Sequence, residues 1–297
     1  MTSAKLPELE GSFALPHTNP PHPLLIEPIV RQALEEDLGR AGDVTSDLLI
    51  PRDRRARAAI AAREAGIVSG LIAAFVAFRL VDPEIRLDAH LPDGRAVGAG
   101  AIIADVEGPA RGILTAERVA LNFLGHLSGV ATATHGLVTA IAGTKARIIC
   151  TRKTLPGLRV LQKYAVRCGG GLNHRFGLDD GVLVKDNHIA AAGDLETAVS
   201  ALRGRLGPMV KIEVEADGLD QLETALALGI DAILLDNMSA ETMKKAVAMT
   251  KGRAKLEASG GVTLERVRAI AESGVDFISS GAITHSARSL DLGLDFL

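Results

Sequence analysis

The chain has 297 residues, of which 47% are hydrophobic and 3% aromatic, and its formal net charge at pH 7 is −3. This length suits one large domain or two ordinary ones. The slightly acidic charge argues against a general nucleic-acid binder, and no apolar run reaches the roughly 18 uncharged residues that a membrane-spanning helix needs. The first residues also lack the basic start and apolar stretch of a signal peptide. We therefore expect a cytoplasmic protein without nucleic-acid or membrane partners.

Residues 1–23 are rich in proline near their end and are predicted to form a poorly ordered tail. His17 and His22 in this tail are interpreted as surface residues and not as metal ligands. The two cysteines, Cys150 and Cys168, have no metal-binding spacing; a disulfide between them is allowed, but their number does not indicate a secreted scaffold.

Residues 24–129 mix helices and strands without regular alternation, as an α+β domain does. Apolar spacing predicts helices over 24–38, 66–81 and 114–124, the last opened by a Thr115 cap. Strands are predicted over 56–63 and 101–107, with a turn at 92–94. Asp43 and Thr45 are candidate helix caps in a turn-rich loop. A further helix over 130–142 is expected to lead into a second domain.

From residue 146 onward the pattern becomes regular. Strands are predicted over 147–150, 181–184, 210–214, 232–235, 255–258 and 275–278, with helical segments over 194–206, 219–228, 240–249 and 263–273. Six strands alternating with helices predict parallel β/α units that close, or nearly close, into a barrel over residues 130–284. A doubly wound open sheet is the alternative, but no Gly-x-Gly-x-x-Gly stands at a strand-to-helix turn.

Charged or phosphate-suited residues follow almost every predicted barrel strand, which is where β/α barrels place their working residues. In chain order these are Thr151, Arg152 and Lys153, then Lys185, Glu215, Asp236, then Ser259, Gly260 and Gly261, and finally Ser279, Ser280 and Gly281. One or two strands that end in such residues are expected by chance, whereas six strands that do so predict an active site. The two Ser-Gly ends follow the last two strands, where barrels commonly bind a phosphate.

The stretch from Thr151 to Arg175 is strongly basic, with three consecutive glycines and no carboxylate. Crowded like charges repel one another, so this local concentration predicts a site for a small polyanion. The basic group consists of Arg152, Lys153, His174, Arg175 and Lys185. It exceeds what one phosphate needs, whereas a dicarboxylate together with a pyrophosphate would use all of it.

Glu215 and Asp236 are carboxylates at neighbouring strand ends, of the kind that holds Mg²⁺ beside substrate phosphates. Glu213, on the same side of the sheet, is an alternative ligand, or a partner for Lys211 or another base. Ordinary ion pairing is the alternative for these carboxylates. Lys185 could instead form a Schiff base, as in a barrel lyase or aldolase, but the flanking cations favour ligand binding.

Six segments resemble the quinolinate phosphoribosyltransferase family: TRKTLPGLRVLQKYAVRCGGGLNHRFGLDDGVLVKDNHI, EEDLGRAGDVTSDLLIP, TAERVALNFLGHLSGVAT, KIEVE, ILLDN and LEASGGV. The resemblance covers about residues 25–297 and keeps the motif order. It implies conversion of quinolinate and phosphoribosyl pyrophosphate, with Mg²⁺, to nicotinate mononucleotide, pyrophosphate and CO₂ for NAD synthesis. It also implies an open β/α barrel with an N-terminal α+β sandwich domain, over residues 24–129, that residues 285–297 rejoin.

The resemblance further implies a homodimer in which the N-terminal domain of one subunit caps the barrel of the other; a larger assembly such as a hexamer stays open. Arg118 matches an arginine that reaches into the neighbouring site. Arg152, His174, Arg175 and Lys185 match quinolinate-binding residues, and Lys153 lies between the substrates. Glu215 and Asp236 match acids near the ribose and Mg²⁺, and the catalytic set is Lys153, Lys185, Glu215 and Asp236. The 5-phosphate cradle comprises Ser259, Gly260, Gly261, Ser280 and Gly281, with His285 as a further candidate.

Three other interpretations are compatible with the residues alone. The first is the lyase or aldolase with an imine on Lys185. The second is a non-catalytic relative that retains phosphate binding, and the third is a relative acting on another heterocyclic acid. His174 and Arg175 beside Arg152 favour a substrate with two carboxylates over one.

Overall fold

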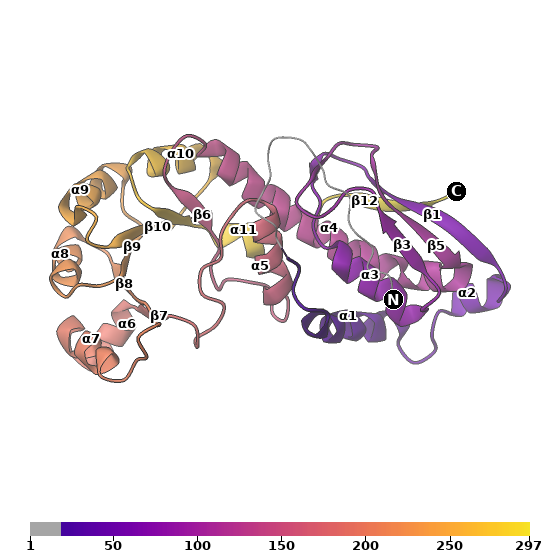
Figure 1. Ribbon diagram of the computed structural model, residues 1–297, viewed down its shortest axis with the longest axis horizontal. Coiled ribbons are helices and arrows are strands. Elements are labelled where there is room, and N and C mark those ends of the chain that lie inside the picture. Colours follow the sequence, from indigo (N-terminus) through magenta and orange to yellow (C-terminus); the bar gives the residue numbers. More distant parts are fainter. Residues whose placement is uncertain (1–18) are drawn as a thin grey trace.

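The computed structural model describes residues 19–297, which form two lobes joined by one long helix (Figure 1). Most of the predicted tail lies outside the described residues, including His17. His22 caps the first helix, α1 (Pro23–Leu38), where its Nδ1 accepts a hydrogen bond from the Leu24 amide at 3.2 Å. Asp43 caps the short helix α2 (Val44–Leu49) as predicted, whereas Thr45 lies within that helix.

The first lobe is built on an antiparallel sheet with strand order β12-β1-β5-β3. Its strands are β1 (Arg55–Ala62), β3 (Arg86–Ala89), β5 (Ile102–Pro109) and β12 (Leu292–Phe296). Helices α1 and α3 (Leu71–Val81) and the first part of α4 (Ala110–Ala140) lie along one side of this sheet (Figure 1). A small pair, β2 (Gly66–Ile67) and β4 (Ala96–Val97), completes the lobe. Because β12 pairs with β1, the end of the chain returns to the first lobe.

Helix α4 differs from the prediction, because it is one helix of 31 residues that begins at Ala110 after Pro109. The predicted Thr115 cap is therefore wrong, and the helices expected over 114–124 and 130–142 are continuous. The glycines between them do not break the helix but allow the returning chain to approach it. A Cβ on Gly125 would lie 2.9 Å from the Leu290 carbonyl oxygen, and one on Gly129 only 2.0 Å from that of Arg288. Helix α3 also starts later than predicted, after Gly70 with its φ of +109°.

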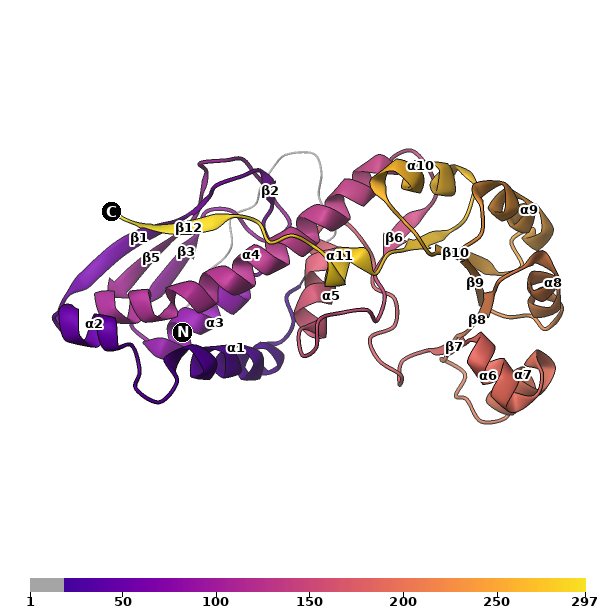
Figure 2. The same ribbon diagram turned by 180° about the vertical axis from the view of Figure 1, so that it is seen from behind.

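The second lobe is an all-parallel sheet with strand order β6-β11-β10-β9-β8-β7. Its strands are β6 (Arg147–Ile149), β7 (Val182–Val184), β8 (Ile212–Ala216), β9 (Ala232–Asp236), β10 (Lys255–Ser259) and β11 (Phe277–Ser279). Helices α6 (Asp186–Ala192), α7 (Leu195–Arg203), α8 (Leu219–Ala227), α9 (Ala240–Thr250) and α10 (Leu264–Glu272) follow the curve of the sheet on its outside (Figure 2). Strands β6 and β7 are the two edges, so the barrel is open, and the predicted fold class is confirmed.

Two more helices connect this sheet to the long helix. Helix α5 (Arg159–Cys168) follows β6, and α11 (Ala282–His285) follows β11; both pack against α4 between the lobes (Figure 2). Cys150 and Cys168 are both buried, and no disulfide joins them. Within residues 19–297, no helix is both long and apolar enough to cross a membrane.

Candidate active site

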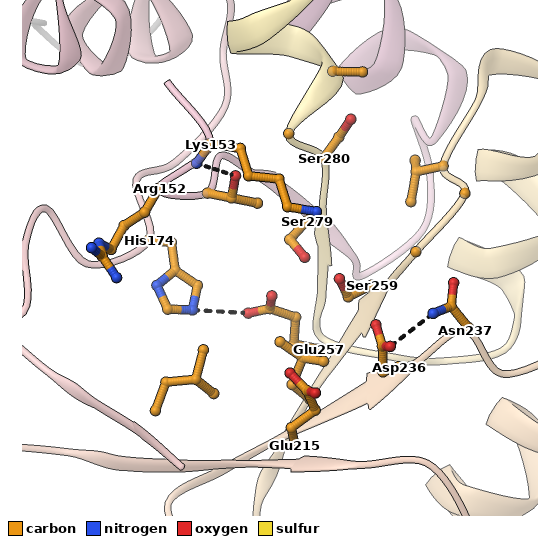
Figure 3. A pocket seen from close by; sticks show the side chains of 18 of the residues that line it. Arg152, Lys153, His174, Glu215, Asp236, Asn237, Glu257, Ser259, Ser279 and Ser280 are labelled. Carbon is orange, nitrogen blue, oxygen red and sulfur yellow. Dashed lines mark hydrogen bonds and ion pairs between the residues drawn. The ribbon is translucent and has the colours of Figure 1, made fainter. Parts of the chain in front are cut away.

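The carboxyl ends of the barrel strands surround one cavity of about 690 Å³, a size typical of small-molecule sites. Every predicted site residue except Arg118 and the alternative metal ligand Glu213 lines this cavity, which we call the strand-end cavity. These residues are Arg152, Lys153, His174, Arg175, Lys185, Glu215, Asp236, Ser259, Gly260, Gly261, Ser280, Gly281 and His285. Figure 3 labels several of them, from Arg152 and Lys153 to Asp236 and Ser280. The structure thus brings together side chains that are up to 133 positions apart, from Arg152 to His285 (285 − 152).

The basic wall of the cavity lies in the two segments that follow β6 and α5. Burial lowers the pKa of Arg175, and the neighbouring Arg152 guanidinium lowers it further by repulsion. The Arg152 Nε is buried without a hydrogen-bond partner among residues 19–297. Two guanidiniums that repel each other are stabilised by an anion placed between them, so this wall is suited to a carboxylate ligand.

Lys153 is held by contacts to Gly281 and helix α11. The Thr284 hydroxyl donates to the Lys153 carbonyl oxygen at 2.8 Å. A Cβ on Gly281 would lie 3.0 Å from Lys153 Cδ and 3.2 Å from the His285 ring. Glycine at 281 therefore leaves the space in which the stem of Lys153 lies.

The acidic wall consists of Glu215 in β8 and Asp236 at the end of β9. Together with Asp217, which the sequence reasoning missed, they place carboxylate oxygens within 4.8 Å of one another. Such a group of hard oxygen ligands fits Mg²⁺ beside a substrate. Lys185 Nζ forms an ion pair with Glu215 Oε2 at 2.5 Å, so the basic and acidic walls meet at this point.

The end of the cavity at β10 and β11 is lined by the two Ser-Gly segments. Gly260 has a φ of +95°, and a Cβ there would lie 2.0 Å from Asn237 Oδ1. Only glycine leaves this backbone unstrained and accessible. Backbone N–H groups and serine hydroxyls in such loops are suited to a phosphate.

A buried group of three side chains forms the floor of the cavity. His174 Nε2 lies 2.8 Å from Glu213 Oε2 and 3.5 Å from Glu257 Oε2 (Figure 3 shows His174 and Glu257). Because the Arg175 amide donates to His174 Nδ1 at 2.7 Å, Nε2 carries the hydrogen and donates to Glu213. Burial, and then the Glu213 charge, raise the pKa of Glu257 well above its usual value.

This floor decides between two expected partners of Glu213 and adds one residue to the site. Of the expected partners, Lys211 or another base, Glu213 pairs with the second kind, His174, whereas Lys211 pairs with Asp231 at the other end of the strand. Glu257 was missed, although its position two residues before Ser259 places it on the same side of β10. Both His174 ring nitrogens contact protein groups, so a direct hydrogen bond to a substrate would require one of these contacts to open.

Arg118 lies apart from the strand-end cavity, on an exposed face of α4. It lines a separate hollow of about 360 Å³ with Asn122 and the returning segment 289–292. Within the described part of the chain it makes no hydrogen bond or ion pair. A role in its own subunit's cavity is therefore not supported by its position.

Comparison with known proteins identifies the family. The family models for the N-terminal and C-terminal domains of quinolinate phosphoribosyl transferase match residues 43–128 and 130–295, respectively. The chain belongs to the quinolinate phosphoribosyltransferase family. It is 42% identical to a probable nicotinate-nucleotide pyrophosphorylase [carboxylating] of Bacillus subtilis, over 92% of this chain and 93% of that one. It is 40% identical to the chloroplastic enzyme of that name from Arabidopsis thaliana, over 98% of this chain and 89% of that one.

Solved structures agree with this assignment to the quinolinate phosphoribosyltransferase family. The nicotinate-nucleotide pyrophosphorylase of Francisella tularensis is 41% identical and superimposes with a TM-score of 0.89, covering 94% of this chain and 99% of that one. Membership of this family argues against an imine-forming lyase. The ion pair between Lys185 and Glu215 argues the same way, because a protonated amine is not a nucleophile.

Proposed function

We infer that this chain is a decarboxylating quinolinate phosphoribosyltransferase. It transfers the phosphoribosyl group of phosphoribosyl pyrophosphate to the pyridine nitrogen of quinolinate, forming nicotinate mononucleotide and releasing pyrophosphate and CO₂. The observation that carries this proposal is the division of one cavity into a wall with paired guanidiniums and an end with two Ser-Gly segments. A dicarboxylate fits the first, and a ribose 5-phosphate fits the second.

The two substrates are proposed to lie side by side in the strand-end cavity. The quinolinate carboxylates contact Arg152, Arg175 and Lys185, which offset their charge, and His174 lies at the floor of this end. The 5-phosphate is bound by Ser259–Gly261 and by Ser280–Gly281, with His285 at the edge. Lys153, held through Thr284, lies between the substrates, where its charge can act on both.

Glu215 and Asp236, with Asp217 near them, are proposed to hold Mg²⁺ at the ribose. When bound, this ion supplies positive charge that offsets the charge developing on the leaving pyrophosphate. The same two carboxylates lie where the ribose would bind, and their negative charge stabilises the positive charge that develops on the sugar as its bond to pyrophosphate breaks.

Little covalent work is then required of the protein. The pyridine nitrogen is the nucleophile, and its lone pair forms the new bond to the ribose carbon as pyrophosphate leaves. The ring nitrogen becomes cationic, so it stabilises the electron pair left on the neighbouring carbon when the adjacent carboxylate departs as CO₂. A proton then replaces the carboxylate. The protein binds, orients and neutralises the reactants.

We propose that the active assembly is a homodimer in the cytoplasm, in which Arg118 completes the cavity of the partner subunit. Two observations support this assembly. Arg118 is exposed and lies outside its own strand-end cavity. Helix α2 of the same lobe presents Leu48 and Leu49 to solvent, with 89% and 72% exposure. Exposed leucines and an exposed arginine on the same lobe are suited to covering the open side of a second barrel.

The direct test is turnover by the purified protein. Quinolinate labelled with ¹³C in its 2-carboxylate is incubated with phosphoribosyl pyrophosphate and Mg²⁺, and both labelled CO₂ and nicotinate mononucleotide are measured by mass spectrometry. The control is Lys145→Ala, because the Lys145 side chain is 58% exposed. The wild-type protein and this control should each form labelled CO₂ and nicotinate mononucleotide in a one-to-one ratio. Lys153→Ala should form neither at a comparable rate. If wild-type protein releases no labelled CO₂, the proposal is wrong.

A further inference from the structure

Helix α5 carries a lysine that is completely buried. Lys163 has 0% exposure, and among residues 19–297 no carboxylate lies within ion-pairing distance of its Nζ. Asp180 is affected by its charge but is not in contact with it. A buried ammonium without a counter-ion destabilises the folded protein, so a function of Lys163 is needed to explain its place in the core.

The Lys163 ammonium joins two segments of the cavity's basic wall. It donates a hydrogen bond to Cys150 Sγ at 3.1 Å and one to the His174 carbonyl oxygen at 2.9 Å. The face of the Phe176 ring covers it, with 5.1 Å between Nζ and the ring centroid. These contacts use the donors of an ammonium group and place it over an aromatic face, as a cation–π interaction requires.

The position of this ammonium is fixed by its neighbour in the helix. Gln162, also fully buried, accepts from the Leu155 amide at 2.9 Å and donates to the Thr284 carbonyl oxygen at 2.7 Å. Helix α5 is thereby fastened to the loop after Lys153 and to α11. The Lys163 ammonium is consequently held at a set distance from the two segments of the basic wall, those that follow β6 and α5.

The contacts of Lys163 lie next to the two guanidiniums of the basic wall. Cys150 is two residues before Arg152, and His174 directly precedes Arg175. Because Arg152 and Arg175 repel each other, some fixed group must hold their backbones at the spacing that a dicarboxylate needs. Lys163 contacts the chain at both places, and it adds a third positive charge behind them.

We propose that Lys163 is a positioning residue for the dicarboxylate substrate. It sets the spacing of the Arg152 and Arg175 segments from behind, and the bound carboxylates supply the negative charge that the folded chain does not place beside it. This proposal rests on the proposed function, because it assigns the basic wall to quinolinate. The proposed role does not require Lys163 to contact the phosphate-binding segments.

The test compares Lys163→Met and Lys163→Gln with a Lys211→Met control, whose lysine is 81% exposed and lies at the other end of β8. Three quantities are measured: quinolinate affinity by calorimetry, the separate KM values for the two substrates, and the folded state by circular dichroism. Loss of hydrogen bonds from a charged donor predicts that quinolinate affinity falls roughly tenfold to a hundredfold in Lys163→Met. Lys163→Gln, which can still donate to the His174 carbonyl, should lose less. The KM for phosphoribosyl pyrophosphate should be unchanged.

A purely structural role makes different predictions. If both KM values rise in the same proportion, if quinolinate affinity equals that of Lys211→Met, or if neither Lys163 variant folds, the positioning role is rejected. Failure of the proposed function can be distinguished from these outcomes. Wild-type protein that binds quinolinate but releases no CO₂ would contradict the function alone, and the affinity comparison would still decide the role of Lys163.

Discussion

Replacing Gln162 with leucine should have two effects at once: it should destabilise the protein and displace Lys153. The Gln162 amide is fully buried and contacts three separate groups: the Leu155 amide, the Thr284 carbonyl oxygen and His126 Nε2, the last at 2.9 Å. Burial lowers the pKa of His126, so its ring is neutral and Nε2 can accept from the amide. Leucine fills nearly the same volume but leaves all three groups without a partner.

The size of the effect follows from those three groups. An unsatisfied buried polar group costs about 1–3 kcal/mol, and partial relaxation reduces the sum. We expect the free energy of unfolding to fall by about 3 kcal/mol, which lowers the thermal midpoint by about 5 °C in a protein of this size. Since Thr284 also donates to the Lys153 carbonyl, kcat/KM should fall with stability.

Urea unfolding followed by circular dichroism measures the stability change, with Gln32→Leu as the matched control on the exposed side of α1. The control should change the free energy of unfolding by less than about 0.5 kcal/mol, as surface substitutions usually do. A Gln162→Leu protein as stable as this control would contradict the prediction, because it would mean that the three partners of Gln162 find other hydrogen bonds.

Three further predictions concern the cavity and the assembly. Arg118→Ala and Lys153→Ala should each be inactive, and mixing them under subunit exchange should restore part of the activity through dimers with one intact cavity. Lys185→Ala should weaken quinolinate binding by roughly 1.5–3 kcal/mol, the range for hydrogen bonds to charged groups, as measured by calorimetry. In thermal unfolding, Glu257→Gln should become more stable relative to wild type as pH rises from 5 to 8. The pKa of Glu257 is raised in the folded state, so the wild-type protein has its full stability below the unfolded pKa of about 4.5 and loses stability as pH rises from there toward the folded pKa.

Each of these predictions has an outcome that contradicts it. Mixtures that stay inactive despite exchange would exclude a shared cavity. An unchanged quinolinate affinity in Lys185→Ala would remove this residue from the quinolinate end, and Lys145→Ala is the control for the loss of a lysine. A stability difference between Glu257→Gln and wild type that does not vary with pH would show that Glu257 titrates normally.

The sequence predicts the barrel and the convergence of its strand ends because both depend on local patterns. Strand and helix periodicity locates the six parallel strands, and the rule for carboxyl ends then places Arg152, Lys185, Glu215 and Asp236 around one cavity. The boundaries shift by up to three residues: β8 continues past Glu215 to Ala216, for example, and β7 and β11 are shorter than expected.

What the sequence does not predict depends on contacts between distant segments. The sequence predicts two helices where α4 is continuous, and the glycines within it allow residues 288–290 to pack against it. The pairing of His174 with Glu213 depends on how the segment after α5 enters the barrel. Lys163 and Gln162 belong to an ordinary amphipathic helix by pattern, and only the structure shows that both are buried and hydrogen-bonded.

A crystal structure of the protein with quinolinate, Mg²⁺ and a non-hydrolysable analogue of phosphoribosyl pyrophosphate tests the central claim most directly. We expect both carboxylates of quinolinate against Arg152, Arg175 and Lys185, the 5-phosphate on the two Ser-Gly segments, and Arg118 of a second subunit at the entrance. Quinolinate bound elsewhere, or the 5-phosphate on the basic wall, would contradict it.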